Sequence, residues 1–223
     1  MSRRIIISLF VLVITIPAIA QNIVSDQHLS RRYRVTVTNL TPGQGLSPAV
    51  IVAHTSAFDL FEVTEAASPG VTRVAEEGDP AVAVAEANAA AGVLDVVVAG
   101  TGPFMPGQSV SAEVEATSGG FLSVIGMLGS TNDAFYGLDS EKLTFSTPTV
   151  LYVSAYDAGS ERNTEDCDHV PGPPCSAMGV RVTEGAEGFI TVHNGIHGFA
   201  DLPPVTHDWN NPVARITIER IFP

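Results

Sequence analysis

The chain has 223 residues, of which 45% are apolar, and its formal charge is −13 at neutral pH. An acidic chain repels nucleic acid and anionic lipid, so we expect no nucleic-acid partner. Once the N-terminal segment is set aside, the remaining length suits one all-β domain better than two.

The first twenty residues have the pattern of a signal peptide, in a form typical of bacterial export. Arg3 and Arg4 supply positive charge, residues 5–16 are apolar, and the run 18–20 (AIA) matches a small-residue cleavage site. The apolar run is shorter than the ~20 residues that span a bilayer, and no later stretch is long enough. We therefore expect a secreted, periplasmic or cell-surface protein, whose formal charge becomes −15 when both arginines are removed.

The next residues mark the start of the folded domain, which we place at 33–223. Residues 21–32 are polar, and we expect them to be flexible. Residues 33–40 alternate apolar and polar side chains, which predicts a half-buried strand. Residues 49–54 form a continuous apolar run, which predicts a buried strand.

Two short helices are predicted after the second strand. Ser68 and Pro69 are typical of a helix start, and the helix should continue through 71–77 and end at Gly78. A second start signal at 79–80 opens the alanine-rich segment 81–91. A low-complexity interpretation of this segment is the alternative.

The remaining apolar segments are strand-like. A long loop rich in Gly, Pro and charge interrupts them at 159–186. Short strands separated by Gly/Pro turns predict an all-β antiparallel sandwich with seven or eight strands. The strands are expected at 93–99, 109–116, 121–128, 150–156, 188–193 and 213–220.

The two cysteines, Cys167 and Cys175, both lie in the part expected to be exported. Disulfides persist outside the cytosol, and one closing this short loop stabilises by roughly 2–3 kcal/mol in the chain-entropy model. A zinc site that includes His169 is the alternative, although zinc sites usually need four ligands at tighter spacing.

Two acidic stretches, 131–140 and 156–161, each follow a predicted strand and are expected on loops at strand ends. Carboxylates that meet there repel one another unless a cation lies between them, and oxygen ligands suit Ca²⁺. The candidate ligands are Asp133, Asp157 and Glu161, with Asp139 in reserve. The alternative is that these are ordinary turn residues, because Asp and Asn are common in turns.

The chain resembles the N-terminal domain of spondins, in a bacterial stand-alone form, over about 33–221. The segment 131–139 (TNDAFYGLD) is similar to the family's Pro-Asp-Trp-Phe-Val-Gly segment, and 156–161 (YDAGSE) is similar to its Asp-Ala-Gly-Thr-Asp segment. Weaker similarity lies at 33–41 (YRVTVTNLT), 60–63 (LFEV) and 211–217 (NPVARIT).

The resemblance implies an eight-stranded antiparallel β-sandwich similar to C2 domains, with one calcium ion held by loop carboxylates. Asp133 matches the aspartate of the first family segment, and Asp157 matches the first aspartate of the second. Glu161 stands where the family commonly has a second aspartate, so its carboxylate is one methylene further from the backbone. The family's animal members act in extracellular adhesion, a biology that transfers poorly to a single domain.

Three histidines are candidate ligands of a second, alternative metal site. His193 and His197 are four residues apart, His207 follows, and Asp208 could orient a ligand. These three histidines predict, as the alternative function, an exported zinc-dependent hydrolase. The sequence has neither Gly-x-Ser-x-Gly nor His-Glu-x-x-His, so no catalytic motif supports an enzyme.

The function expected from the sequence is therefore a secreted, calcium-binding adhesion or interaction module and not an enzyme. Its partner would be an extracellular or cell-envelope protein or a glycan, and the mature form would not span a membrane. A structural periplasmic protein without an ion is the plainest alternative.

Overall fold

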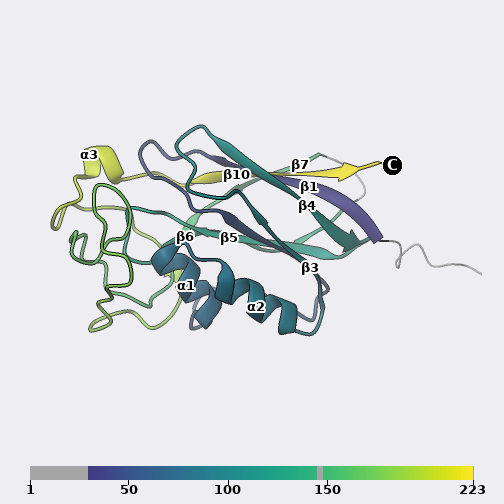
Figure 1. Ribbon diagram of the computed structural model, residues 1–223, viewed down its shortest axis with the longest axis horizontal. Helices are drawn as coiled ribbons and strands as arrows, with labels where there is room; N and C mark the ends of the chain where they lie inside the picture. The colour runs from purple at the N-terminus through teal and green to yellow at the C-terminus, as the bar shows by residue number, and fades with distance from the viewer. Residues whose placement is uncertain (1–29, 145–147, 223) are drawn as a thin grey trace, which may run out of the picture.

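Two antiparallel sheets face each other in the computed structural model, which describes residues 30–144 and 148–222 (Figure 1). One sheet has four strands and the other has six. The predicted antiparallel sandwich, with short helices after the second strand, is confirmed. The expected signal peptide and residues 21–29 lie outside the described residues.

The four-stranded sheet has the order β4-β1-β10-β7, so β1 and β10 are its central strands. Along β1 the side chains of Tyr33, Val35 and Val37 are buried between the sheets, while Arg32 and Arg34 reach outward to Glu113. This is the alternation predicted for the first strand, which begins at Ser30, three residues earlier than expected. The strands are β1 (Ser30–Asn39), β4 (Ser109–Thr117), β7 (Thr149–Val153) and β10 (Ala214–Ile221).

The six-stranded sheet has the order β3-β2-β5-β6-β8-β9 and is covered on both faces. One face packs on the other sheet, and the second packs under the helices. Every residue of β2 is buried for this reason, which explains its continuous apolar sequence. The strands are β2 (Ala49–His54), β3 (Val93–Ala99), β5 (Phe121–Met127), β6 (Ala134–Lys142), β8 (Ala155–Asp157) and β9 (Thr191–Val192).

The helices α1 (Pro69–Glu77) and α2 (Ala81–Ala89) form the outer layer of this sheet (Figure 1). Ser68 accepts a hydrogen bond from the Val71 N–H through its side chain, and Gly78 ends the helix with a φ of 66°. The predicted start and end of α1 are therefore confirmed. A third helix, α3 (Pro204–His207), was not expected. Within 30–144 and 148–222, no helix is long and apolar enough to cross a membrane.

The structure corrects three of the predicted strand assignments. Residues 134–142 form β6 instead of a loop, because Phe135 and Tyr136 are buried on opposite faces of a doubly covered sheet. The strand expected at 150–156 is divided at Ser154, where the chain passes from the four-stranded to the six-stranded sheet. The strand expected at 188–193 is reduced to the two residues of β9.

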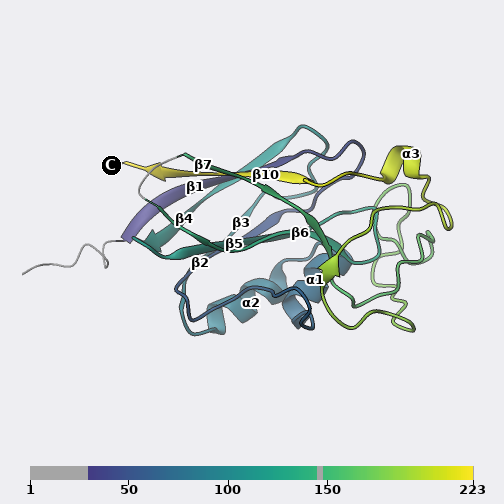
Figure 2. The same ribbon diagram turned by 180° about the vertical axis from the view of Figure 1, so that it is seen from behind.

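Long loops gather at one end of the sandwich, and the start of β1 and the end of β10 lie at the other (Figures 1 and 2). The loop end contains the β5–β6 turn and the segment between β8 and β9. Cys167 and Cys175 form a disulfide within that segment, so the predicted pairing is confirmed. The two acidic stretches that were expected to meet are therefore at the same end of the molecule.

Candidate functional site

Asp133 is the last residue of the turn that connects β5 to β6, and its side chain is fully buried. Thr131 shapes this turn, because its hydroxyl donates to the Leu128 carbonyl and accepts from the Ala134 N–H. The β6–β8 register pairs Ala134 with Asp157, so Asp133 and Asp157 lie next to each other across the strands. The structure thus brings together the two aspartates predicted from the sequence.

The carboxylate of Asp133 is bonded on one oxygen only. Oδ2 accepts hydrogen bonds from the Ser160 N–H at 2.7 Å, the Ser160 hydroxyl at 3.1 Å and the Glu161 N–H at 2.9 Å. Oδ1 is buried and has no hydrogen-bond partner among the described residues. A buried carboxylate oxygen without a partner is energetically costly.

Asp157 is held in a tight turn at the end of β8. Its Oδ1 accepts from the Gly159 N–H at 2.7 Å, and its Oδ2 accepts from the side-chain amide of Asn163. Gly159 has a φ of 66°, and a Cβ there would lie 2.3 Å from the Phe189 carbonyl oxygen. Only glycine fits this position, so the Asp-Ala-Gly sequence has a direct structural reason.

The two aspartates form an uncompensated acidic pair. Burial and the nearby Asp157 charge raise the pKa of Asp133 to about 8, against the hydrogen bonds from Ser160 and Glu161. Burial also raises the pKa of Asp157, against the bonds from Asn163 and Gly159. Both shifts oppose the charged form, which is the electrostatic situation that a bound cation relieves.

Glu187 is an exposed acidic residue in the glycine-rich stretch before β9, thirty residues after Asp157. Partial burial and then the charge of Asp157 raise its pKa. Its carboxylate makes no contact with either aspartate of the pair among the described residues, so we do not count it as a ligand.

Glu161 contributes its backbone to the site, but its carboxylate has other partners. Its Oε1 accepts from the Val182 N–H at 3.3 Å and lies 3.8 Å from Arg181 Nε. Burial and the charge of Glu76 raise the pKa of Glu161 to about 7. The side chain therefore connects this loop to the 181–182 segment, where Arg181 in turn pairs with Glu76 of α1 at 2.6 Å.

Asp139, the reserve candidate, lies six residues after Asp133 on the far half of β6. Its Oδ1 accepts from the Leu60 N–H at 2.8 Å and the Ser123 hydroxyl at 3.1 Å. These bonds attach the segment before α1 to the sheet. The structure does not bring Asp139 to the Asp133–Asp157 pair.

The three histidines proposed for zinc have separate environments. His193 is buried beside Trp209, accepts from the Gly195 N–H through Nδ1, and meets Asn163 Oδ1 through Nε2, so both ring nitrogens are engaged. Burial and the charge of His197 lower its pKa to about 4. His197 stacks on Phe199, and His207 lies in α3 with its Nδ1 on the Thr206 hydroxyl.

Across residues 30–144 and 148–222, no group of three or more His, Cys, Asp or Glu side chains is arranged to hold a metal ion. The donor set at the loop end is therefore two neighbouring aspartates, one of them with a free buried oxygen. This set suits a hard cation that takes its remaining oxygen ligands from carbonyls and water. It does not suit zinc, which prefers nitrogen and sulfur ligands.

A comparison with models of protein families relates this chain to known proteins. The model of the spondin N-terminal domain, Spondin_N, matches residues 33–174, more than half of the chain. The chain belongs to the Spondin_N family. The matched span begins within β1 and ends inside the disulfide loop, so it includes the β5–β6 turn and the end of β8 that carry the two aspartates.

The Spondin_N domain is an extracellular adhesion-type module that is generally non-catalytic. A disulfide at Cys167–Cys175 agrees with an extracellular setting. No curated protein matches this chain. The family match confirms the resemblance to the spondin N-terminal domain over residues 33–174, and the bacterial stand-alone form stays a prediction.

Proposed function

We propose that this Spondin_N domain binds one calcium ion at the loop end of the sandwich, with Asp133 and Asp157 as its carboxylate ligands. The unpartnered, buried Oδ1 of Asp133 carries the proposal. If Asp133 is ionised, Oδ1 lacks a donor, and if it is protonated, that oxygen still lacks a partner. A divalent cation would balance the charge of both aspartates at once.

Calcium would hold two loops in one arrangement. Asp133 already binds the backbone of Ser160 and Glu161, and its own carbonyl accepts from the Ala158 N–H at 3.1 Å. A cation shared with Asp157 would remove the repulsion that opposes these contacts. The loop end would then present a fixed surface to an extracellular or cell-envelope protein or a glycan.

A chain of side chains would transmit the ion's effect into the following loop. Asn163 donates to Asp157 through its amide nitrogen and meets His193 Nε2 at 3.2 Å through its amide oxygen. The His193 ring lies 5.0 Å from the Trp209 ring. The neutral histidine fits this chain because its Nδ1 accepts a hydrogen bond, so its Nε2 carries the proton.

Thermal unfolding of metal-stripped protein, with and without added calcium, tests the proposal. A ligand that binds only the folded state stabilises by about 2.7 kcal/mol at one hundred times Kd, so calcium should raise Tm by several degrees. Asp157→Asn keeps the size of the side chain but removes its charge, and we expect it to abolish most of this increase.

Asp168→Asn is the matched control, because Asp168 is an exposed aspartate outside the acidic pair. This variant should respond to calcium like the wild type. An unchanged Tm in the wild type after calcium addition would show that the domain is a structural module without an ion. If both variants lost the calcium-induced increase in Tm equally, calcium would act through the general negative charge of the protein and not through the aspartate pair.

A further inference from the structure

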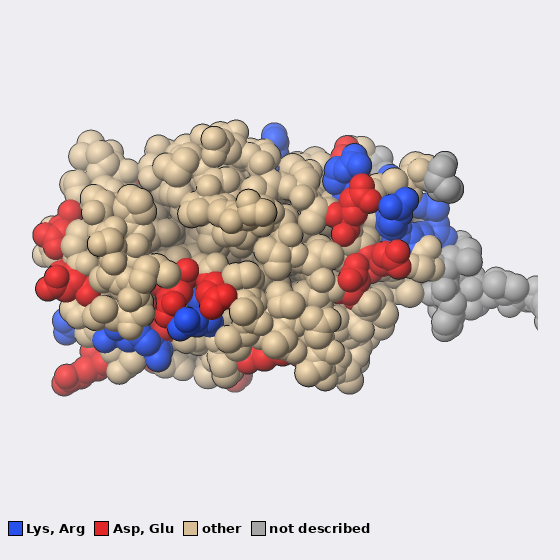
Figure 3. Space-filling model, viewed as in Figure 1, with Lys and Arg blue, Asp and Glu red and all other residues tan. Residues whose placement is uncertain are grey.

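A large cavity lies between the helical layer and the loops, and the two aspartates are not among its lining residues. Its volume is about 810 Å³, within the roughly 300–1,000 Å³ typical of small-molecule sites. Its walls come from the end of α1, the β1–β2 and β3–β4 connections, the end of β5 with the turn after it, the loop around the disulfide, and His207 of α3. On the face shown in Figure 3, most charged residues lie toward the two ends and the lower part, and the middle is largely uncharged.

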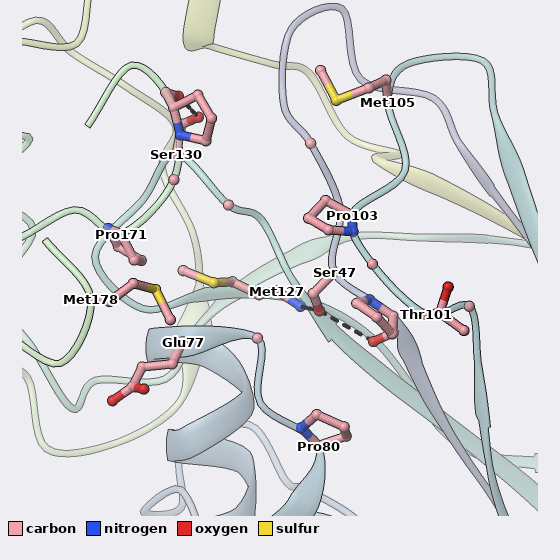
Figure 4. Close-up of a pocket in the computed structure, with 18 of the residues that line it drawn as sticks. Ser47, Glu77, Pro80, Thr101, Pro103, Met105, Met127, Ser130, Pro171 and Met178 are labelled. Atoms are coloured by element: carbon pink, nitrogen blue, oxygen red, sulfur yellow. Dashed lines mark hydrogen bonds between the residues drawn. The ribbon is translucent and has the colours of Figure 1, made fainter. Parts of the chain in front are cut away.

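The walls are apolar and built from adaptable side chains. Met105 and Met178 are 52% and 58% exposed, an unusual degree of exposure for large apolar residues on one cavity rim. Met127 is buried and lies beside Met178, with Met105 apart from both (Figure 4). Methionines are flexible and polarisable, so they fit apolar ligands of irregular shape. Prolines and glycines form most of the remaining wall.

Most polar groups of the cavity are already bonded within the protein. The Ser47 hydroxyl donates to the Pro48 carbonyl and accepts from the Met127 N–H, as the dashed lines show (Figure 4). The Ser130 hydroxyl donates to the Pro173 carbonyl. Glu77, the only Asp or Glu on the described wall, is paired with Arg73. At the rim, Thr101 offers one further hydroxyl.

We infer that this cavity binds a neutral, largely apolar small molecule. The volume matches a single compact ligand, because six chain segments line it. A charged ligand would lose its hydration against walls whose one carboxylate, Glu77, is already paired with Arg73 and whose one imidazole, His207, has its Nδ1 on the Thr206 hydroxyl. An anion would also be repelled by a chain whose net charge is −13.

Two fluorescent probes with similar aromatic skeletons test the inference on the purified protein. Phenylnaphthylamine is neutral, and anilinonaphthalene sulfonate is its anionic counterpart. The neutral probe should bind one saturable site, with its Kd unchanged by calcium or chelator. The sulfonate should bind at least about tenfold more weakly, a difference of about 1.4 kcal/mol. Equal affinity for the two probes, or no saturation by the neutral one, would overturn the inference.

Two variants locate the site. A Cβ at Gly45 would lie 3.5 Å from Met105 Sδ, so Gly45→Leu fills the cavity without a backbone clash. Met178→Glu places a charge at the rim. Each should weaken the neutral probe by about tenfold or more.

Val150→Glu is the matched control, because Val150 is 46% exposed on β7 and does not line the cavity. It should leave the Kd within about twofold of the wild type. Tm measurements establish whether each variant is folded. If Gly45→Leu does not fold, the result for Met178→Glu alone decides the test. A Kd that changes equally for Met178→Glu and Val150→Glu would place the probe elsewhere and contradict the inference.

Discussion

The two oxygens of the Asp133 carboxylate have opposite environments. Oδ2 is surrounded by three donors from the neighbouring loop, and Oδ1 is buried without one. Such asymmetry is unfavourable in an isolated domain, because an unsatisfied buried acceptor costs on the order of 1–3 kcal/mol. It becomes favourable if a cation occupies the space at Oδ1, which is why this single atom supports the calcium proposal.

The raised pKa of Asp133 predicts how stability depends on pH without calcium. An unfolded aspartate titrates near pH 4, and Asp133 in the fold titrates at about 8, so the folded state binds more protons between these values. Stability from this group is therefore fully present below about pH 4 and is lost as pH rises toward 8. Chemical denaturation of metal-free protein at several pH values measures this slope.

Saturating calcium should remove most of that decrease, because the ion stabilises the ionised aspartates and releases a proton when it binds. The variant Asp133→Asn, which cannot titrate at this position, should show a smaller decrease without calcium. A metal-free wild type whose stability rises steadily from pH 5 to 8 would contradict this assignment.

At the scale of elements, the start of α1 illustrates how one side chain connects two helices. The Ser68 hydroxyl accepts from the Val71 N–H at 3.2 Å and donates to Glu86 of α2 at 2.9 Å, and the same Glu86 oxygen accepts from the Gly70 N–H. The cap thus holds α1 and α2 together where they cover β2 and β5. Their packing protects the outer face of the six-stranded sheet.

We expect Ser68→Ala to lower the free energy of unfolding by about 1 kcal/mol, the usual cost of losing an N-cap. Urea denaturation followed by circular dichroism measures the loss. Ser118→Ala, in the turn between β4 and β5, is the control and should change stability by less than about 0.5 kcal/mol. Equal effects in the two variants would show that the cap hydrogen bonds add nothing to stability.

At the scale of the whole molecule, the rigid body and the loops proposed to bind a ligand are separate parts of the sandwich. The sheets and helices supply the rigid body, and the loops at one end carry the acidic pair (Figures 1 and 2). The disulfide restricts the conformational freedom of the longest of these loops. The lining of the methionine-lined cavity does not include the acidic pair, although Ser130 on its wall stands three residues before Asp133 in the same turn.

Hydrogen exchange in the presence and absence of calcium should reveal this separation. The amides of Ala158, Ser160 and Glu161 bond to Asp133, and that of Gly159 bonds to Asp157. Their exchange should slow by up to roughly a hundredfold at one hundred times Kd. The paired amides of β1 and β10 serve as the internal control and should change little. Uniform slowing across both sheets would indicate global stabilisation instead of a local site.

Local patterns in the sequence determined much of this structure. Alternation fixed the faces of β1, a continuous apolar run marked β2, and Ser68 and Gly78 marked the ends of α1, because each depends on neighbouring residues alone. The motifs also identified the family and the two aspartates that the structure brings together. The Asp-Ala-Gly segment was informative because Gly159 is required by its own turn geometry.

The tertiary structure decided what depends on distant contacts. Residues 134–142 form a strand because helices and a second sheet cover both sides of Phe135 and Tyr136, a fact that no local pattern contains. The carboxylate of Glu161 lies near Arg181, and the three histidines have separate partners, only because of the path of the long loop. The cavity exists because six separated segments meet, so its volume and its apolar walls are properties of the packed chain.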